Sequence, residues 1–353
     1  MQMILKKFFI LISIIFFVLI FLYFYIYHPK QFLLYIAETK KNLPEIYKSE
    51  VSITFAGDVM LGRLVGHRHQ KDNFSTLFEN FNTQIFKNSD IAWLNLEGPI
   101  SDTIVEQDLS SEDLNFLFSY ESLNALKHLQ INLVGLANNH TFNSGNEGLE
   151  LTQSLLEKTG INWHGLPTKV NDESVYRFEK DDIRVSLIAV HTLYNGSEFG
   201  IDEIIRSEKN KGYFVIVLPH WGEEYMTKHS IRQEEYAKNW SNSGASIIIG
   251  THPHVVQDAQ VIKNKEGRNT LVFYSLGNFI FDQMFSEETQ LGLILKIDLD
   301  LENSTNIKLH PVESIDLKPQ NADDVKSQII INRVCENIKF YCDLNNGVID
   351  IKL

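Results

Sequence analysis

Cysteine is nearly absent from this chain, which has two cysteines among 353 residues. That count excludes a disulfide-built scaffold and a zinc module with four cysteine ligands, so the stability of the fold must come from packing. The two cysteines, Cys335 and Cys342, are seven positions apart. On one continuous helix their Cα atoms would be about 10 Å apart, too far for a disulfide. They can pair only if a helix ends between them, and the sequence leaves this open.

A broad basic surface is also missing, because the formal net charge is −13. Residues 1–50 hold six lysines and three glutamates, so the remaining residues carry about −16. This balance argues against a protein that binds nucleic acid through a broad basic face. An anionic ligand would need local help, for example from a bound metal ion.

Internal repeats and proline- or serine-rich linkers are absent as well, although 44% of the residues are hydrophobic and 22% are charged. This composition is typical of a folded globular protein. We therefore expect one large domain over residues 51–300, preceded by a stalk over residues 28–50. Residues 301–353 are expected to form a C-terminal extension packed on the domain, with a helix over residues 322–340.

Near the N-terminus, residues 8–27 contain no Asp, Glu, Lys, Arg or His. As a helix this segment would be about 30 Å long, enough to cross the hydrocarbon core of a bilayer. Lys6 and Lys7 precede it, and no small-residue cleavage site follows. We therefore expect residues 8–27 to be an uncleaved signal anchor that crosses the cell membrane once. Residues 1–7 would lie in the cytoplasm and the bulk of the chain on the outer side of the membrane.

Seven short apolar runs share one feature, which is that each leads directly to polar residues. The runs and the residues that follow are 51–57 and Asp58; 91–96 and Glu97; 131–137 and Asn138, Asn139 and His140; 185–190 and His191; 213–219 and His220; 246–250 and His252 and His254; and 271–276 and Asn278. Helix-like stretches at 147–159 and 231–244 alternate with them. The pattern predicts an α/β fold with a largely parallel, doubly covered sheet. The polar residues should then meet at one sheet edge.

The residues at these ends are mainly His, Asp, Glu and Asn, whose nitrogen and oxygen atoms suit Zn, Mn or Fe ions. His252-Pro253-His254 should hold two imidazoles in a short extended turn, because proline restricts the residue before it. In the run after residue 137, one asparagine can be a ligand while the other caps a turn. A metal site would activate water for attack on a phosphoester, and His140 could protonate the leaving group.

Three further residues are candidates for contact with substrate. Arg63 could hold a phosphate or carboxylate, and an ion pair with an acidic side chain is the alternative. His191 ends a strand and could face the pocket. Asn278 could contact substrate or could simply form the turn after its strand. Of Glu223 and Glu224, one could orient an imidazole.

At this point the chain resembles a known family, the bacterial CapA/PgsA-type capsule (poly-γ-glutamate) synthesis proteins, which are similar to calcineurin-like metallophosphoesterases. Six blocks carry the resemblance in family order: FAGDVMLGR (55–63), NLEGP (95–99), ANNH (137–140), PHWGEEY (219–225), GTHPH (250–254) and YSLGNFIFD (274–282).

The resemblance implies a four-layer α/β/β/α sandwich that binds one or two divalent metal ions. It places Asp58 and His254 on one ion, Asn139, His220 and His252 on the other, and Glu97 near both. His140 matches the proton donor of the phosphoesterases. Two positions depart from the pattern: Met60 stands where those enzymes have a histidine ligand, and Asn143 stands where the family often has aspartate.

These observations support three hypotheses about function. The leading one is an outward-facing, membrane-anchored protein that serves synthesis or export of an anionic capsule polymer such as poly-γ-glutamate through a metal-dependent, phosphoesterase-like site. Its expected partners are capsule synthase subunits. The second is a surface metallophosphoesterase acting on nucleotides, lipids or wall precursors. The third is a binding or scaffold subunit without catalysis.

Overall fold

The computed structural model describes residues 50–106, 114–301 and 304–353. The predicted signal anchor at 8–27, the N-terminal tail and all but the last residue of the predicted stalk lie outside these ranges. Among the described helices, none has the length and apolar character needed to cross a bilayer.

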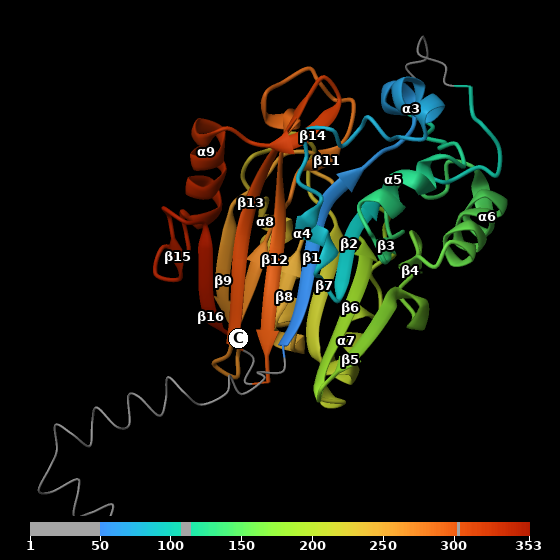
Figure 1. The fold of residues 1–353 in the computed structure, drawn as a ribbon. Helices are drawn as coiled ribbons and strands as arrows, with labels where there is room; N and C mark the ends of the chain where they lie inside the picture. The colour runs from blue at the N-terminus through green and yellow to red at the C-terminus, as the bar shows by residue number, and fades with distance from the viewer. Residues whose placement is uncertain (1–49, 107–113, 302–303) are drawn as a thin grey trace, which may run out of the picture. The chain divides into compact units, whose positions relative to one another are not determined.

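Two β-sheets form the centre of the described domain (Figure 1). The first sheet follows the order β15-β16-β13-β12-β1-β2-β3-β4, with β11 paired to β1 and β14 to β13. Its strands are β1 (Glu50–Val59), β2 (Ile91–Leu96), β3 (Leu133–Gly135), β4 (Asn162–His164), β11 (Asn278–Ile280), β12 (Leu291–Asp300), β13 (Ser304–Ile315), β14 (Lys318–Asn321), β15 (Cys342–Asp343) and β16 (Val348–Lys352). Strands β1 to β4 are parallel, whereas β12 is antiparallel to β1.

The second sheet has the order β5-β6-β7-β8-β10-β9. Its strands are β5 (Val175–Lys180), β6 (Ile183–His191), β7 (Phe214–His220), β8 (Ile247–Ile249), β9 (Ala259–Lys263) and β10 (Asn269–Phe273). The four central strands β6, β7, β8 and β10 are parallel, and the two outer strands are antiparallel to their neighbours.

Helices cover the outer faces of both sheets. The helices are α3 (Arg63–His69), α4 (Gln84–Lys87), α5 (Ser122–His128), α6 (Gly145–Lys158), α7 (Ile201–Asn210), α8 (Ile231–Ser243) and α9 (Asp324–Cys335), with short 3-10 turns η1 (Gln70–Asp72), η2 (Asp172–Ser174) and η3 (Glu288–Gln290). Apolar side chains of α5 and α6 share a core with the first sheet, and those of α7 and α8 share one with the second. A third core lies between the two sheets, and α9 contributes to it.

This arrangement confirms a mixed α/β fold with two sheets, as in the sandwich that the resemblance implied, and corrects the single, largely parallel sheet expected from the strand pattern. The seven predicted strands are all present, but β1, β2 and β3 belong to the first sheet while β6, β7, β8 and β10 belong to the second. Alternating apolar runs reveal strands but not which sheet each strand joins. The polar residues at the strand ends therefore come from two sheets.

The C-terminal residues add strands to the first sheet. β12 and β13 pair in a continuous register from Leu291↔Glu313 to Leu299↔Thr305, on both sides of residue 300. The predicted helix over 322–340 was too long, because α9 ends at Cys335. The chain turns there, which brings Cys335 and Cys342 into a disulfide with a Cα–Cα distance of 6.0 Å.

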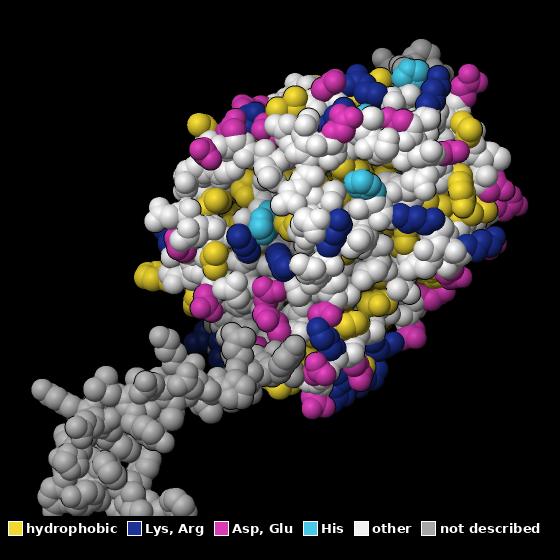
Figure 2. Space-filling view, in the orientation of Figure 1, with side chains coloured by type: hydrophobic (Ala, Val, Ile, Leu, Met, Phe, Trp, Pro, Cys, Tyr) yellow, Lys and Arg dark blue, Asp and Glu magenta, His cyan; other side chains and the backbone are white. Residues whose placement is uncertain are grey.

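The face shown in Figure 2 carries acidic and basic side chains interspersed. Such mixing is typical of a soluble surface. The negative net charge is therefore not gathered into one patch on this face.

A close backbone contact positions the start of the candidate site. Gly57 precedes Asp58 in β1, and the Asp58 N–H donates to the carbonyl oxygen of Gly277 at 3.0 Å. A Cβ on Gly57 would lie 1.9 Å from that same oxygen. Only glycine allows the two segments to come this close.

We therefore expect Gly57→Ala to lower the free energy of unfolding by about 3 kcal/mol, since the backbone must shift to relieve the overlap. Gly160→Ala is the control: Gly160 has a φ of +77° but open space around its Cβ position. Its cost should be only about 1 kcal/mol, for the left-handed backbone. Urea unfolding measures both, and equal losses would contradict the close-contact account.

A second prediction concerns pH. His164 is buried; its Nε2 accepts the indole N–H of Trp93 at 2.8 Å, and burial lowers its pKa to about 4. In the unfolded chain the pKa returns to about 6.5. The contribution of His164 to the free energy of unfolding is therefore fully present above about pH 6.5. It decreases as the pH falls from about 6.5 to about 4, and it does not decrease further below about pH 4.

Between pH 7 and pH 5 we expect His164→Gln to lose about 2 kcal/mol less stability than the wild type, because the variant lacks this titration. Urea unfolding at the two pH values gives the comparison. An identical loss in both proteins would show that His164 is not the group responsible.

Candidate metal centre

Glu97 is a buried carboxylate without a hydrogen-bond partner. It follows β2, its side chain is 0% exposed, and neither Oε1 nor Oε2 has a partner among the described residues. Burial raises the pKa of Glu97 well above its usual value, and the carboxylates of Asp58 and Glu224 raise it further. A buried carboxylate with no compensating group is costly, and a cation bound beside Glu97 would offset that cost.

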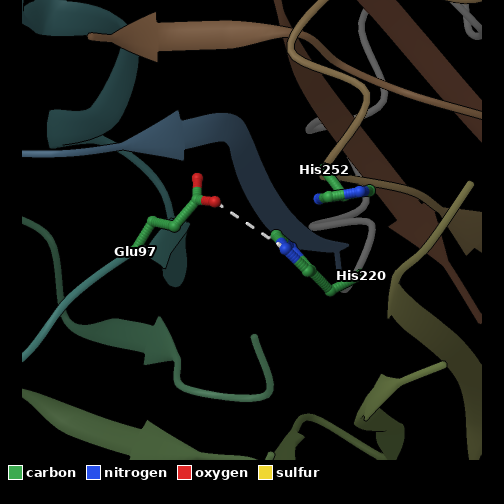
Figure 3. A group of neighbouring side chains, drawn as sticks. All are labelled: Glu97, His220 and His252. Atoms are coloured by element: carbon green, nitrogen blue, oxygen red, sulfur yellow. Dashed lines mark ion pairs between the residues drawn. The ribbon is translucent and has the colours of Figure 1, made fainter. Parts of the chain in front are cut away.

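Imidazole rings surround this carboxylate. Glu97 Oε1 lies 3.8 Å from His220 Nε2 and 3.9 Å from the Nε2 atoms of both His140 and His254. Figure 3 shows the Glu97 carboxylate pointing toward His220, with His252 beside it. Glu97 and His140 follow β2 and β3 of the first sheet, whereas His220 is the last residue of β7 and the turn with His252 and His254 follows β8, so both sheets contribute to one centre.

Three of the rings are oriented through Nδ1. The Nδ1–H of His254 donates to Asn278 Oδ1 at 2.9 Å, and that of His140 donates to Asn143 Oδ1 at 3.0 Å. His191 Nδ1 donates to the carbonyl oxygen of Pro167 at 2.9 Å. Fixing one nitrogen in this way leaves Nε2 of each ring available, which is how metal-binding histidines are usually held.

A chain of amides holds Asp58 in place. Asn95 Nδ2 donates to Asp58 Oδ1 at 2.7 Å, and Asn138 Nδ2 donates to Asn95 Oδ1 at 3.0 Å. Asn138 Oδ1 in turn accepts the His140 N–H at 3.1 Å. Burial is the largest influence on the pKa of Asp58 and raises it, partly offset by His254 and by the hydrogen bonds from Asn95 and from the His252 N–H.

The sequence left open which of Asn138 and Asn139 could be a metal ligand, and the structure places their side chains differently. Asn138 is fully buried, and its Nδ2 donates hydrogen bonds to Asn95 Oδ1 and to the carbonyl oxygen of Leu96. Asn139 Oδ1 lies 2.8 Å from His220 Nε2. Of the two amides, only that of Asn139 reaches the imidazole cluster.

The turn that contains His252 and His254 is not extended, contrary to the expectation from the proline between them. His252 has a φ of 97° and His254 a φ of 58°, both in the left-handed region. The His252 N–H donates to Asp58 Oδ2 at 3.0 Å, and tertiary contacts of this kind override the local preference. His252 Nδ1 is buried without a partner.

These residues form three overlapping groups whose ligand atoms lie within 4.8 Å of one another. The groups are Glu97, His220 and His252; Asp58, Glu97 and His254; and Glu224, His252 and His254. The unpartnered atoms of Glu97 and His252 fit the oxygen and nitrogen donor set that divalent Mn, Fe or Zn prefers. These largely buried clusters of His, Glu and Asp could therefore hold a divalent metal ion.

Burial also keeps the imidazoles neutral. Burial lowers the pKa of His140 and of His191 to about 4. It lowers the pKa of His220 and of His252 well below the usual value, and neighbouring histidines lower both further. Neutral imidazole is the form that binds a metal ion. These four imidazoles can therefore coordinate a metal ion at neutral pH without first losing a proton.

The three residues predicted to contact substrate have other partners in this structure. Arg63 forms a two-point ion pair with the buried carboxylate of Asp282, the alternative that the sequence had left open. Asn278 orients His254. His191 packs beside His220, with ring centroids 5.8 Å apart, and its Nε2 is buried and unpartnered.

The two departures from the resemblance have structural explanations. Met60 is fully buried in the core under the first sheet, so the position that would carry a histidine ligand is apolar here. Asn143 still holds His140, because its Oδ1 accepts hydrogen bonds from His140 Nδ1–H and from the Phe116 N–H. The ring of Phe116 also stacks on His140, with centroids 4.0 Å apart.

Two residues of the centre were not assigned from the sequence. Asn95 lies in β2, two positions before Glu97, which follows the strand; in extended chain this spacing places two side chains on the same side, a signal that could have been used. Glu224 was considered only as an orienting residue, yet it belongs to one of the groups that could hold a metal ion. Its position in a turn rather than at a strand end gave no such signal.

Comparison with known proteins now adds to this geometry. Residues 52–283 match the family described as "Bacterial capsule synthesis protein PGA_cap". The chain is 26% identical over 334 residues to the "PGA biosynthesis protein CapA" of Bacillus subtilis (strain 168), covering 88% of this chain and 84% of that protein. It is 27% identical over 265 residues to the "Capsule biosynthesis protein CapA" of Bacillus anthracis, covering 69% and 63%.

Among solved structures, a hypothetical protein from Thermus thermophilus aligns with a TM-score of 0.42 and 15% identity, over 76% of this chain and 96% of that one. That level of similarity carries no argument about this fold. The family match spans most of the described domain, including every residue of the candidate centre. The protein belongs to the PGA_cap family of bacterial capsule synthesis proteins, as the resemblance predicted.

The unpartnered carboxylate leads to a prediction about metal binding. At 100 times its dissociation constant, Mn²⁺ should raise the stability of the wild type by about 2.7 kcal/mol. Glu97→Gln should lose most of this gain. At pH 8 the metal-free variant should nevertheless be at least as stable as the metal-free wild type, because a neutral amide is cheaper to bury than an ionised carboxylate.

Glu313→Gln is the matched control, because Glu313 is a buried carboxylate that is paired with Lys326. This change should lower stability with and without Mn²⁺ and leave the metal-induced gain intact. Thermal unfolding after chelation and after Mn²⁺ addition distinguishes the cases. A metal-free Glu97→Gln protein that unfolds well below the wild type would contradict the account.

Proposed function

We propose that this protein is a metal-dependent hydrolase of the phosphoesterase type that acts in the synthesis or export of an anionic capsule polymer such as poly-γ-glutamate. The observation that carries the proposal is the buried, unpartnered Glu97 carboxylate among His140, His220 and His254. The named relatives, described as capsule and PGA biosynthesis proteins, support the choice of polymer.

In this proposal Asp58, Glu97 and His254 would hold one ion, and Asn139, His220 and His252 a second, with Glu97 shared and Glu224 at its edge. A bound divalent ion supplies a more acidic water and neutralises charge on a phosphoryl oxygen. The protein's part is to orient the donors, through the Nδ1 hydrogen bonds of His140 and His254 and the amide chain at Asp58, and to bury them away from water.

His140 would transfer a proton in this scheme. Its Nδ1–H is given to Asn143, so the neutral ring presents an unprotonated Nε2 toward the site. That nitrogen can serve as a proton donor only after it has taken up a proton. A negatively charged substrate beside it would raise its pKa in that direction.

Arg63 would act indirectly. Its guanidinium lies over the ring of Phe116 at 5.2 Å, and the same ring stacks on His140. Its ion pair with Asp282 anchors this stack. Arg63 thus supports the position of His140, and a direct contact with substrate would use the exposed 27% of its side chain.

Location and partners form the outer part of the proposal. We place the domain outside the cell, held by the predicted anchor at 8–27, where it would meet capsule synthase subunits and the growing polymer. The acidic balance of the chain supports local contacts with an anionic polymer rather than attraction over the whole surface. A surface phosphoesterase that acts on nucleotides, lipids or wall precursors would use the same centre.

One observation favours a second function, that of a subunit that binds metal without catalysis. Met60 is buried in the core at the position of a phosphoesterase metal ligand, which leaves one ion with fewer protein donors. A site of this kind could bind polymer or stabilise a synthase complex. Turnover decides between the two functions.

Hydrolysis of bis(p-nitrophenyl) phosphate tests the proposal. We expect turnover to need Mn²⁺, to stop after chelation, and to fall about 100-fold or more in His140→Ala while bound metal is retained. Glu97→Gln should lose both metal and turnover.

His128→Ala is the control for the loss of a histidine, since His128 stacks on Phe78 at the end of α5 and takes no part in the imidazole cluster. This variant should keep both metal and turnover. If the wild type binds metal but shows no turnover, the proposal of a hydrolase is wrong and the metal-binding subunit without catalysis is favoured.

A further inference from the structure

A groove of about 590 Å³ lies on the first sheet away from the metal centre. β12 and β13 form its floor, the loop before α4 and α4 itself form one wall, and residues from the end of β14 to the first turn of α9 form the other. On the face shown in Figure 2, lysine or arginine side chains gather around a histidine over β12 and β13. None of the residues assigned to the metal centre lines this groove.

Two lysines stand opposite one another on the groove floor. Lys296 of β12 and Lys308 of β13 are direct cross-strand partners, and both line the groove. Neither forms an ion pair with any side chain of the described ranges. Like charges in directly opposite positions destabilise a sheet, so this pair carries a cost in the free protein. An anion between them would remove that cost.

A histidine next to the lysines has one ring nitrogen without a hydrogen-bond partner in the described part of the chain. His310 lies two residues after Lys308 in β13, and its Nε2 is buried without a hydrogen-bond partner. Burial lowers the pKa of His310 to about 4, and both lysines lower it further. The ring is therefore neutral at pH 7 and offers a hydrogen bond rather than a second repelling charge.

The other side chains that line the groove indicate which chemical class of anion it would bind. Gln84, Asn306 and Asn321 present amide groups that both donate and accept hydrogen bonds, and Ile294 and Val312 supply apolar contacts. Asp298 is the groove's one acidic lining residue. Amide groups match the backbone of a polyamide, whereas a phosphate chain has no groups that donate to them. The lysines would meet carboxylates on the same chain.

We propose that this groove binds an acidic polyamide chain, with carboxylates held between Lys296 and Lys308 and chain amides held by the asparagine and glutamine side chains. Identifying that chain with the capsule polymer rests on the proposed function. The groove's affinity for acidic polyamides does not, since it requires neither metal nor hydrolysis. It is a second contact for an extended ligand, separate from the catalytic centre.

Fluorescence polarisation with a fluorescein-labelled γ-linked decaglutamate tests this on the full-length protein, with a chelator present so that the metal centre cannot contribute. We expect Lys296→Gln and Lys308→Gln each to weaken binding about tenfold, the value of one charge-assisted hydrogen bond. Lys265→Gln, at an exposed lysine before β10, is the matched control and should bind as the wild type does.

Stability provides a second readout. Lys308→Gln should unfold at the same or a higher temperature than the wild type without ligand, because the repulsion is relieved. Unchanged affinity in both groove variants would overturn the proposal. Inorganic polyphosphate of equal charge that displaces the probe as well as unlabelled decaglutamate does would also overturn it, since the groove would then sense charge alone. Failure of Mn²⁺-dependent hydrolysis would not change these outcomes.

Discussion

The burial of one carboxylate without a partner constrains the whole structure. Glu97 is 0% exposed, and Asp58 lies close enough to raise its pKa further. Neutral imidazoles cannot compensate two buried acids, so the metal-free site is destabilising by itself. A divalent cation bound beside both carboxylates would remove this conflict.

The two-sheet fold makes this arrangement possible. Asp58 and Glu97 lie at strand ends in the first sheet, whereas His220 ends a strand of the second sheet and His252 and His254 follow another. Beside Asp58, the backbone of Gly277, just before β11, approaches β1 so closely that Gly57 has no room for a side chain. Hydrogen bonds from Asn143 and Asn278 then fix individual rings. Rigid strands therefore determine where the donors lie, and polar residues in turns determine how they are oriented.

Much of this could be predicted from the sequence, because apolar runs that end in His, Asp, Glu and Asn mark both the strands and the site. All seven runs are strands, and their terminal residues Asp58, Glu97, Asn139, His220, His252 and His254 do converge. Their division between two sheets was not predictable from periodicity, since sheet membership depends on long-range pairing. The left-handed turn at His252 and the partner of Arg63 likewise depend on contacts more than 190 residues away in sequence.

The account predicts that a cation occupies the space beside Glu97, and anomalous X-ray diffraction from crystals grown with Mn²⁺ tests this most directly. Data collected at the manganese edge should show one or two peaks within coordinating distance of Glu97 and of the Nε2 atoms of His220 or His254. A difference map without a peak there, or with Glu97 hydrogen-bonded to a protein group instead, would contradict the central claim.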